Sequence, residues 1–247
     1  LYVLNKSDLS DGKSEKFAAM IEAQGKSCVA ISAVNGASRR VLEKRLQILT
    51  KEKRERAESK GVTRRFRYTV VGIPNTGKST VVNLLGGAKR AKTGDIAGVT
   101  RDVRWIKCAD FDLLDTPGTM PPSCKTQYLA RHLAYIGSLN DDILDIADVA
   151  LELLKELKAD YPAALQERYG IDCGGNDAET DKTADEEERT REAVEMLETA
   201  CRRRGFILRG GEFDYERGAR AVIDDFRKGR LGKICLENPS DFADVKF

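Results

Sequence analysis

Short apolar runs and helical stripes alternate along the first part of the chain. Apolar residues dominate positions 1–4 and 27–31, and both runs are short enough for buried strands. Between them, a stripe that includes Phe17 and Ile21 predicts a helix over 14–24. A strand, a helix and a second strand in this order are typical of a parallel sheet with a crossover helix.

The same alternation continues as far as residue 137. The expected elements are helix 37–60, strand 66–71, helix 78–85, strands 102–107 and 111–114 paired as a hairpin, and helix 126–136. This succession predicts an α/β fold with a doubly wound sheet.

The pattern changes after residue 137, where strand signals nearly vanish. The helices expected there cover 145–157, 162–169, 190–203 and 215–228. The stretch 174–188 is polar and acidic, which predicts a flexible insertion without enough apolar residues to pack. We therefore expect two domains, an α/β domain over 1–137 and a smaller all-α domain over 138–247.

Composition narrows the class of protein only a little. The chain has 247 residues with a formal net charge of +2, and no apolar run approaches the roughly 20 residues needed to span a bilayer. Its six cysteines are scattered without a C-x-x-C pair. This spacing argues against a disulfide framework and a zinc site, and it favours a reducing compartment.

Positive charge is concentrated between Arg39 and Arg67. This segment holds twelve Lys and Arg residues against four Glu. One interpretation is a solvated helix face with ion pairs between successive turns, and the other is a surface that contacts RNA phosphates. A second basic group, Arg202 to Arg204, is a further candidate for RNA contact.

The residues Gly72–Thr80 match the phosphate-binding pattern G-x-x-x-x-G-K-[ST]. A Gly-rich turn that only caps a helix is the alternative, but here a strand precedes the pattern and a helix follows it, as phosphate binding requires. Lys78 is expected to reach the β- and γ-phosphates, and the Ser79 hydroxyl to bind Mg²⁺.

Two loops earlier in the chain predict a guanine site. Asn5-Lys6-Ser7-Asp8 fits N-K-x-D, and the Asp8 carboxylate suits the two parallel N–H donors of guanine. Asn5 would face the guanine O6 or tie the loop together, and Lys6 would pack along the base. Ser32 and Ala33 end the next strand and offer a backbone N–H to O6.

Asp115-Thr116-Pro117-Gly118 fits D-x-x-G and ends the strand 111–114. Asp115 is expected to hold Mg²⁺ and the Gly118 N–H to contact the γ-phosphate, although Asp, Pro and Gly also favour a plain turn. Thr100 is the best candidate for a switch threonine that completes the Mg²⁺ site, and Thr93 is a weaker rival.

These motifs occur in permuted order, because N-K-x-D and Ser-Ala precede the phosphate loop. The chain resembles the circularly permuted GTPases of the YlqF/YawG family, and among them the RbgA-like ribosome biogenesis GTPases and their mitochondrial relatives. Tyr161-Pro162, Glu167–Ile171 and Gly210–Asp214 resemble the C-terminal helical domain of that branch.

The resemblance implies a P-loop fold with a helical RNA-binding domain. It implies a monomeric GTPase that uses Mg²⁺ and acts as an assembly factor on the large ribosomal subunit through rRNA contacts. The expected GTP contacts are Asn5, Lys6, Asp8, Ser32, Ala33, Asn75, Thr76, Gly77, Lys78, Ser79, Thr80, Thr100 and Gly118. Lys78, Thr100 and Gly118 are expected to act in hydrolysis, and Ser79, Thr100 and Asp115 to bind Mg²⁺.

The sequence departs from this family at its water-orienting group. Thr119 follows the D-x-x-G motif where many GTPases have Gln. The histidine that the resemblance implies, within a Pro-Gly-His-Met element, is missing from this chain, and His132 lies in a predicted helix where a satisfied structural role is favoured. Asn75 occupies a position linked in related GTPases to K⁺.

Two other functions stay open at this point. The first is a nucleotide-gated RNA-binding module with little or no GTPase activity, and the second is an ATP-using P-loop enzyme. For the GTPase, we expect slow hydrolysis that the ribosomal particle stimulates.

The chain starts at Leu1, within an expected strand, and this predicts that the natural N-terminus is missing. A targeting peptide would then be invisible. The expected location is cytoplasmic for a bacterial source, and mitochondrial or in another organelle for a eukaryotic one.

Overall fold

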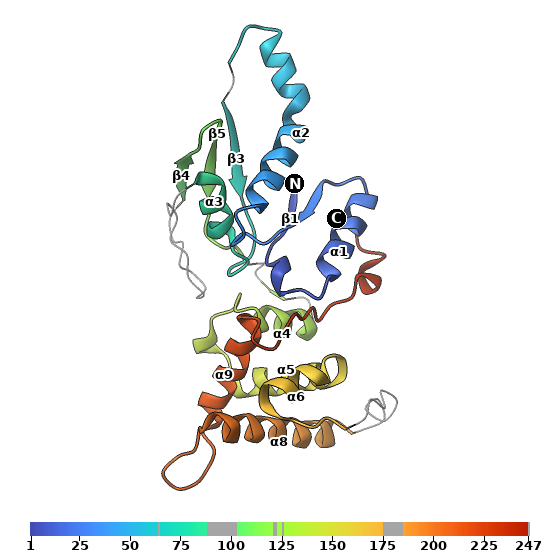
Figure 1. Cartoon of the computed structure of the whole chain (residues 1–247), viewed down its shortest axis with the longest axis vertical. Helices are drawn as coiled ribbons and strands as arrows, with labels where there is room; N and C mark the ends of the chain where they lie inside the picture. The colour runs from blue at the N-terminus through green and yellow to red at the C-terminus, as the bar shows by residue number, and fades with distance from the viewer. Residues whose placement is uncertain (64, 88–102, 121–122, 125, 175–184, 247) are drawn as a thin grey trace. The chain divides into compact units, whose positions relative to one another are not determined.

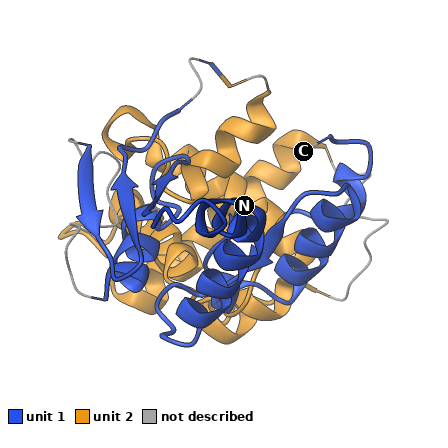
Figure 2. Ribbon diagram, turned by 90° about the horizontal axis from the view of Figure 1, so that it is seen from above, with its two compact units in different colours: residues 1–123, 237–247 blue, residues 124–236 orange. Residues whose placement is uncertain are grey.

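The computed structural model of the chain describes residues 1–63, 65–87, 103–120, 123–124, 126–174 and 185–246. It divides into two compact units, coloured separately in Figure 2. The first unit comprises residues 1–123 and 237–247, and the second comprises residues 124–236.

The first unit has the predicted α/β succession, which can be followed in Figure 1. Its elements are β1 (Tyr2–Leu4), η1 (Ser7–Leu9), α1 (Lys13–Ala23), β2 (Cys28–Ala30), α2 (Ser38–Glu58), β3 (Phe66–Val70), α3 (Lys78–Gly86), β4 (Arg104–Lys107), β5 (Phe111–Asp115) and η3 (Pro239–Phe242). Each α-helix and strand lies within a few residues of the range that the sequence predicts, whereas the short 3-10 helices η1 and η3 were not predicted.

The strands of this unit form two hydrogen-bonded ladders. β1 pairs in parallel with β2, and β3 pairs in parallel with β5, so α1 and α3 are crossover helices as expected. β4 pairs antiparallel with β5, which confirms the predicted hairpin. No ladder joins β1 to β3 among the described strands, so the expected single sheet is present as two sheets, in the orders β1-β2 and β3-β5-β4.

One apolar core nevertheless serves both sheets. Val29 and Ile31 from the end of β2 belong to the same buried cluster as Phe66 of β3 and Leu113 of β5. Val82 of α3 is completely buried in this cluster, which also includes Leu42 of α2, Leu85 of α3 and Ile106 of β4. The helices therefore cover the sheet face that carries Phe66, Ile106 and Leu113, because side chains alternate between the two faces along a strand.

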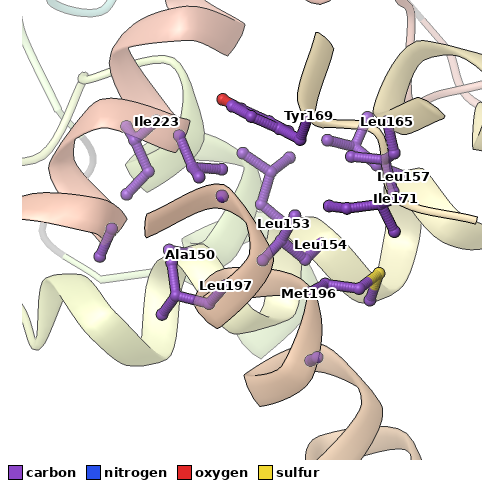
Figure 3. Close-up of a cluster of buried hydrophobic side chains, with 14 of the residues drawn as sticks. Ala150, Leu153, Leu154, Leu157, Leu165, Tyr169, Ile171, Met196, Leu197 and Ile223 are labelled. Atoms are coloured by element: carbon purple, nitrogen blue, oxygen red, sulfur yellow. The ribbon is translucent and has the colours of Figure 1, made fainter. Parts of the chain in front are cut away.

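The second unit is built of helices in the described residues, apart from one isolated antiparallel bridge between Ile207 and Phe213. Its elements are α4 (Gln127–Tyr135), η2 (Asp141–Ile143), α5 (Ile146–Asp160), α6 (Pro162–Tyr169), α8 (Glu186–Arg204) and α9 (Tyr215–Arg227). Leu153, Leu154 and Leu157 of α5 are completely buried against α8 and α9, as Figure 3 shows for part of the cluster. The Asp145 side chain caps α5 by accepting hydrogen bonds from the N–H groups of Ala147 and Asp148.

A fully buried carboxylate links the helices of this unit. Asp225 of α9 accepts hydrogen bonds from Arg168 at 2.9 and 3.0 Å, from the Tyr169 hydroxyl at 2.9 Å and from Arg230 at 2.8 Å. Arg204 of α8 lies 3.4 Å away. Burial alone would raise the pKa of Asp225, but these hydrogen bonds outweigh it and hold the pKa below its usual range.

The boundary between the units differs from the predicted one. Helix α4 belongs to the second unit because Tyr135 is completely buried in its core and Arg227 donates to the backbone carbonyls of Ala134 and Tyr135. The last residues return to the first unit, where Phe242 packs edge to face on Phe17 with ring centroids 5.6 Å apart.

The acidic stretch predicted as an insertion is shorter than expected at its C-terminal end. Glu186, Glu187 and Glu188 form the first turn of α8, where negative charge is favourable at a helix N-terminus. Lys155 donates to Glu186 at 2.7 Å and to Thr190 at 2.9 Å. Residues 175–184 lie outside the described part of the chain. Across the described residues, no helix is long and apolar enough to cross a membrane.

Candidate functional site

The predicted motifs follow the C-terminal ends of four strands of the first unit. Residues 5–8 directly follow β1, and residues 32–33 follow β2 after one intervening residue. Residues 72–79 come shortly after the end of β3, and residues 115–118 begin at the last residue of β5. These are the ends at which ligand-binding loops of open α/β sheets lie. The structure therefore places all four motifs at the edge where a nucleotide site is expected.

Asn5 connects three of these loops. Its Nδ2 donates to the backbone oxygen of Thr76 at 2.9 Å, and its Oδ1 accepts from the N–H of Ala33 at 2.9 Å. The second predicted role was to tie the N-K-x-D loop together, and the hydrogen bonds go further because they join this loop to two others. A side chain at Gly77 would collide with Asn5 Nδ2, so glycine is needed there for close approach as well as for its φ of 84°.

The phosphate loop is closed by its own side chains. The Thr76 hydroxyl donates to the Ile73 oxygen at 2.9 Å, and Lys78 Nζ donates to the same oxygen at 2.7 Å. Asn75 has a left-handed backbone with a φ of 58°, and α3 begins at Lys78. Burial lowers the pKa of the Lys78 amine, and the charge of Asp115 opposes this shift. The backbone and the ammonium group together suit an anion, since a helix N-terminus carries partial positive charge.

Asp115 lies beside the phosphate loop and is almost completely buried, at 2% exposure. The Ser79 hydroxyl donates to its Oδ2 at 3.2 Å, whereas its Oδ1 is buried without a hydrogen-bond partner among the described residues. Burial raises the pKa of the Asp115 carboxyl, while the Ser79 hydrogen bond and the Lys78 charge favour its ionised form. A buried carboxylate oxygen next to a hydroxyl is a donor set that fits Mg²⁺.

The D-x-x-G loop packs directly on the phosphate loop. The Thr116 hydroxyl donates to the Val70 oxygen at 2.7 Å, and the N–H of Thr119 donates to the Gly72 oxygen at 3.2 Å. A Cβ added to Gly118 would lie 2.7 Å from the Cα of Pro74, so only glycine fits. Sequence reasoning missed the anchoring role of Thr116, because the inner positions of D-x-x-G have no fixed residue type.

The structure describes most of the remaining predicted residues. The N–H of Ser7 donates to the Ile31 oxygen at 3.0 Å, which holds the N-K-x-D loop against the end of β2. Lys6 has a left-handed backbone with a φ of 61°, and Asp8 is exposed. Ser32 lies in the turn that precedes α2, and Thr80 is the third residue of α3. Thr93 and Thr100 lie outside the described residues.

His132 lies in α4 of the second unit and has partners there. Its Nε2 is 3.0 Å from Glu156 Oε2, and Glu156 also accepts from the Tyr135 hydroxyl at 3.0 Å. The ring is buried and packs against Tyr128 with centroids 4.1 Å apart. These contacts agree with the predicted structural role.

The basic segment around α2 is partly occupied by internal contacts. Arg45 pairs with Glu22 at 2.6 Å, and the Arg54 guanidinium lies over the Phe66 ring at 4.7 Å from its centroid. Arg65 donates to Asp112 and to backbone carbonyls of the β4–β5 turn. Some of the positive charge in this segment therefore stabilises the first unit itself.

Comparison with known proteins shows that the chain is similar to GTPases. Residues 67–171 match the family model described as 50S ribosome-binding GTPase. The chain is 34% identical to ribosome biogenesis GTPase A of Bacillus cereus over 99% of this chain and 78% of that protein. It is 27% identical to ribosome biogenesis GTPase A of Thermotoga maritima over 100% of this chain and 79% of that protein.

A solved structure has a similar fold. The GDP-bound structure of TM YlqF aligns with a TM-score of 0.60 and 26% sequence identity, covering 97% of this chain and 83% of that chain. The alignment spans both the α/β unit and the helical unit, in agreement with the predicted fold class.

Proposed function

The chain belongs to the ribosome biogenesis GTPase A family. From this we propose that the loops at residues 5–8, 32–33, 72–79 and 115–118 bind GTP. We further propose that GTP hydrolysis controls when the protein acts on the large ribosomal subunit. Family membership makes the chain a GTP-binding ribosome assembly factor that hydrolyses GTP. The assignment of individual residues, of rRNA as the ligand and of the large subunit as the partner is our proposal.

The hydrogen bonds of Asn5 are the observation that carries this proposal. They bring together the N-K-x-D loop, the Ala33 N–H and the phosphate loop at Thr76, although these elements are far apart in the sequence. A plain P-loop enzyme that uses ATP does not require an N-K-x-D loop at this place. The arrangement therefore favours guanine as the base, with Asp8 accepting from its two N–H donors.

The phosphate end of the ligand would lie at the start of α3. Lys78 neutralises phosphate charge, and the Gly118 N–H is available to a γ-phosphate when its loop closes. Ser79 and Asp115 would hold Mg²⁺, which supplies charge neutralisation of the phosphates when bound. K⁺ at Asn75 would add a further positive charge, and replacing K⁺ by Na⁺ in the assay buffer tests this by a fall in the hydrolysis rate.

The switch between GTP and GDP would act through residues 115–118. Loss of the γ-phosphate would remove the contact to Gly118 and release this loop, as in other nucleotide switches. The N-K-x-D and Ser-Ala motifs precede the phosphate loop, so the D-x-x-G motif is the last nucleotide motif before the helical unit. A change at Gly118 is therefore passed to the chain segment that leads into α4.

Single-turnover GTP hydrolysis, with and without large-subunit precursor particles, tests the proposal. We expect slow hydrolysis by the protein alone and faster hydrolysis with particles, because water positioning is incomplete in the free protein. Equal rates would overturn the coupling to the particle and favour a nucleotide-gated RNA-binding module. A variant with Lys78→Ala is the control for contaminating nucleotidases.

A further inference from the structure

The outer face of the β3–β5–β4 sheet has an unusual set of exposed side chains. Strand alternation places Arg67 and Thr69 of β3 on this face, opposite to the buried Phe66, and Arg65, which directly precedes β3, lies on the same face. On β4, Trp105 and Lys107 point the same way, opposite to the buried Ile106. Helices α2 and α3 pack on the other face of the sheet, and in the described part of the chain Arg67, Thr69 and Trp105 are exposed on this one.

Trp105 is the only tryptophan of the chain, and it is 51% exposed. The Arg67 guanidinium lies over its ring at 5.3 Å from the centroid. Arg67 is itself exposed, so a planar guanidinium and an indole are held together at the surface. A large aromatic group left half in water contributes little to the stability of the unit, and such groups are enriched at binding surfaces.

The charge of this face is positive. Its one described acidic side chain, Asp112 of β5, is paired with Arg65 at 2.9 Å. Arg65 is fixed further by donating to the Ala109 oxygen at 2.9 Å. In the register of the sheet, both Arg67 and Lys107 align with Asp112, so these basic residues lie on the same face as Trp105.

We propose that this face, formed by Arg67, Trp105 and Lys107, binds single-stranded RNA by stacking bases on Trp105 and Arg67. A sheet with exposed aromatic and guanidinium groups stacks unpaired bases, while neighbouring cations attract the phosphates. A duplex keeps its bases stacked on one another and does not offer them to a flat surface. The inference rests on the proposed action on rRNA and adds a defined contact surface in the GTPase unit.

Trp105 provides a direct readout because no other residue contributes tryptophan fluorescence. The full chain, saturated with GDP, is titrated with a short oligouridylate and with a duplex of the same length. We expect the single strand to quench the fluorescence, and the duplex to quench it much less. Equal quenching by both, or none by the single strand, would overturn the proposal.

Variants separate stacking from charge. Trp105→Ala, followed by fluorescence anisotropy of labelled RNA, is expected to lower the affinity about 10-fold through the lost stacking. Arg67→Lys keeps the charge but loses the planar group, so it should weaken binding by about 3-fold, and Arg67→Ala by more. Lys16→Ala removes one charge from an exposed position on α1 and should leave the affinity within about 2-fold.

The outcomes also separate this inference from the proposed function. GDP affinity is measured for every variant, and it is expected to stay at the level of the unmodified chain, since Trp105 and Arg67 lie outside the nucleotide loops. Equally strong RNA binding by Trp105→Ala and by the unmodified chain would show that RNA binds elsewhere. It would refute the proposed RNA-binding face and leave the proposed function unaffected. Failure of the unmodified chain to bind GDP would overturn the proposed function, whether or not RNA quenches Trp105.

Discussion

Replacing Asn5 with alanine removes two hydrogen bonds that join three loops of the first unit. The donor to the Thr76 oxygen and the acceptor for the Ala33 N–H are both lost, each at 2.9 Å. Each bond contributes about 1 kcal/mol net. The Ala33 N–H belongs to a buried residue, and leaving it without a partner adds about 1–2 kcal/mol. The expected loss in the free energy of unfolding is therefore about 3–4 kcal/mol.

The same variant should lose nucleotide affinity. The guanine loop and the phosphate loop would no longer be held in register, so part of the binding energy would be spent on ordering them. We expect GDP affinity to fall by at least about 10-fold, which corresponds to about 1.4 kcal/mol. Isothermal titration calorimetry with GDP measures this, and Trp105 fluorescence in urea follows the unfolding of the first unit, which contains the only tryptophan.

Asn5→Asp is the matched control. The carboxylate still accepts from the Ala33 N–H but has no donor for the Thr76 oxygen, so the two bonds are separated. We expect a smaller loss of stability than with alanine, together with weaker GDP binding. If Asn5→Ala unfolded at the same urea concentration as the unmodified chain and bound GDP equally well, the role of Asn5 as a tie between loops would be refuted.

Three further predictions concern the base, the switch loop and the helical unit. Asp8→Asn should lower GDP affinity at least about 10-fold and improve binding of xanthosine diphosphate. The amide presents one donor and one acceptor to the base, where the carboxylate presents two acceptors. Unchanged tight GDP binding would contradict the guanine assignment. Gly118→Ala should slow single-turnover GTP hydrolysis by about 10-fold or more, since the added Cβ would lie 2.7 Å from the Cα of Pro74 and push the D-x-x-G loop away from the phosphate loop. An unchanged rate would show that hydrolysis does not require close contact between these two loops. Asp225→Asn should destabilise the second unit by about 2–3 kcal/mol, measured by circular dichroism in urea, because the hydrogen bonds from Arg168, Tyr169 and Arg230 lose their charged acceptor. Because the folded pKa of Asp225 is lowered, its contribution is present above the unfolded pKa of about 3.9 and is lost as the pH falls through the folded value, so the difference between the variant and the unmodified chain should shrink in acid.

The order of residues along the chain was sufficient to predict the elements of the fold and to recognise the nucleotide motifs. Apolar periodicity depends on residues close together in the chain, and it placed α6 at its observed bounds and the other α-helices within a few residues of theirs. The phosphate loop and the D-x-x-G loop can also be recognised locally, since each motif is a short run of residues that includes Gly77 or Gly118. The permuted order of the motifs is visible from the sequence alone.

Which of these elements contact one another became apparent only in the folded chain. Asn5 and Thr76 are 71 positions apart, and no local pattern shows that one donates to the other. The same holds for the boundary between the units, because η3 returns to α1 from the far end of the chain. Arg67 and Trp105 each look like ordinary strand residues in the sequence, and they form a surface only when β5 brings β3 and β4 together. Long-range pairing depends on the packing of whole elements, and this is why it is decided only in the folded chain.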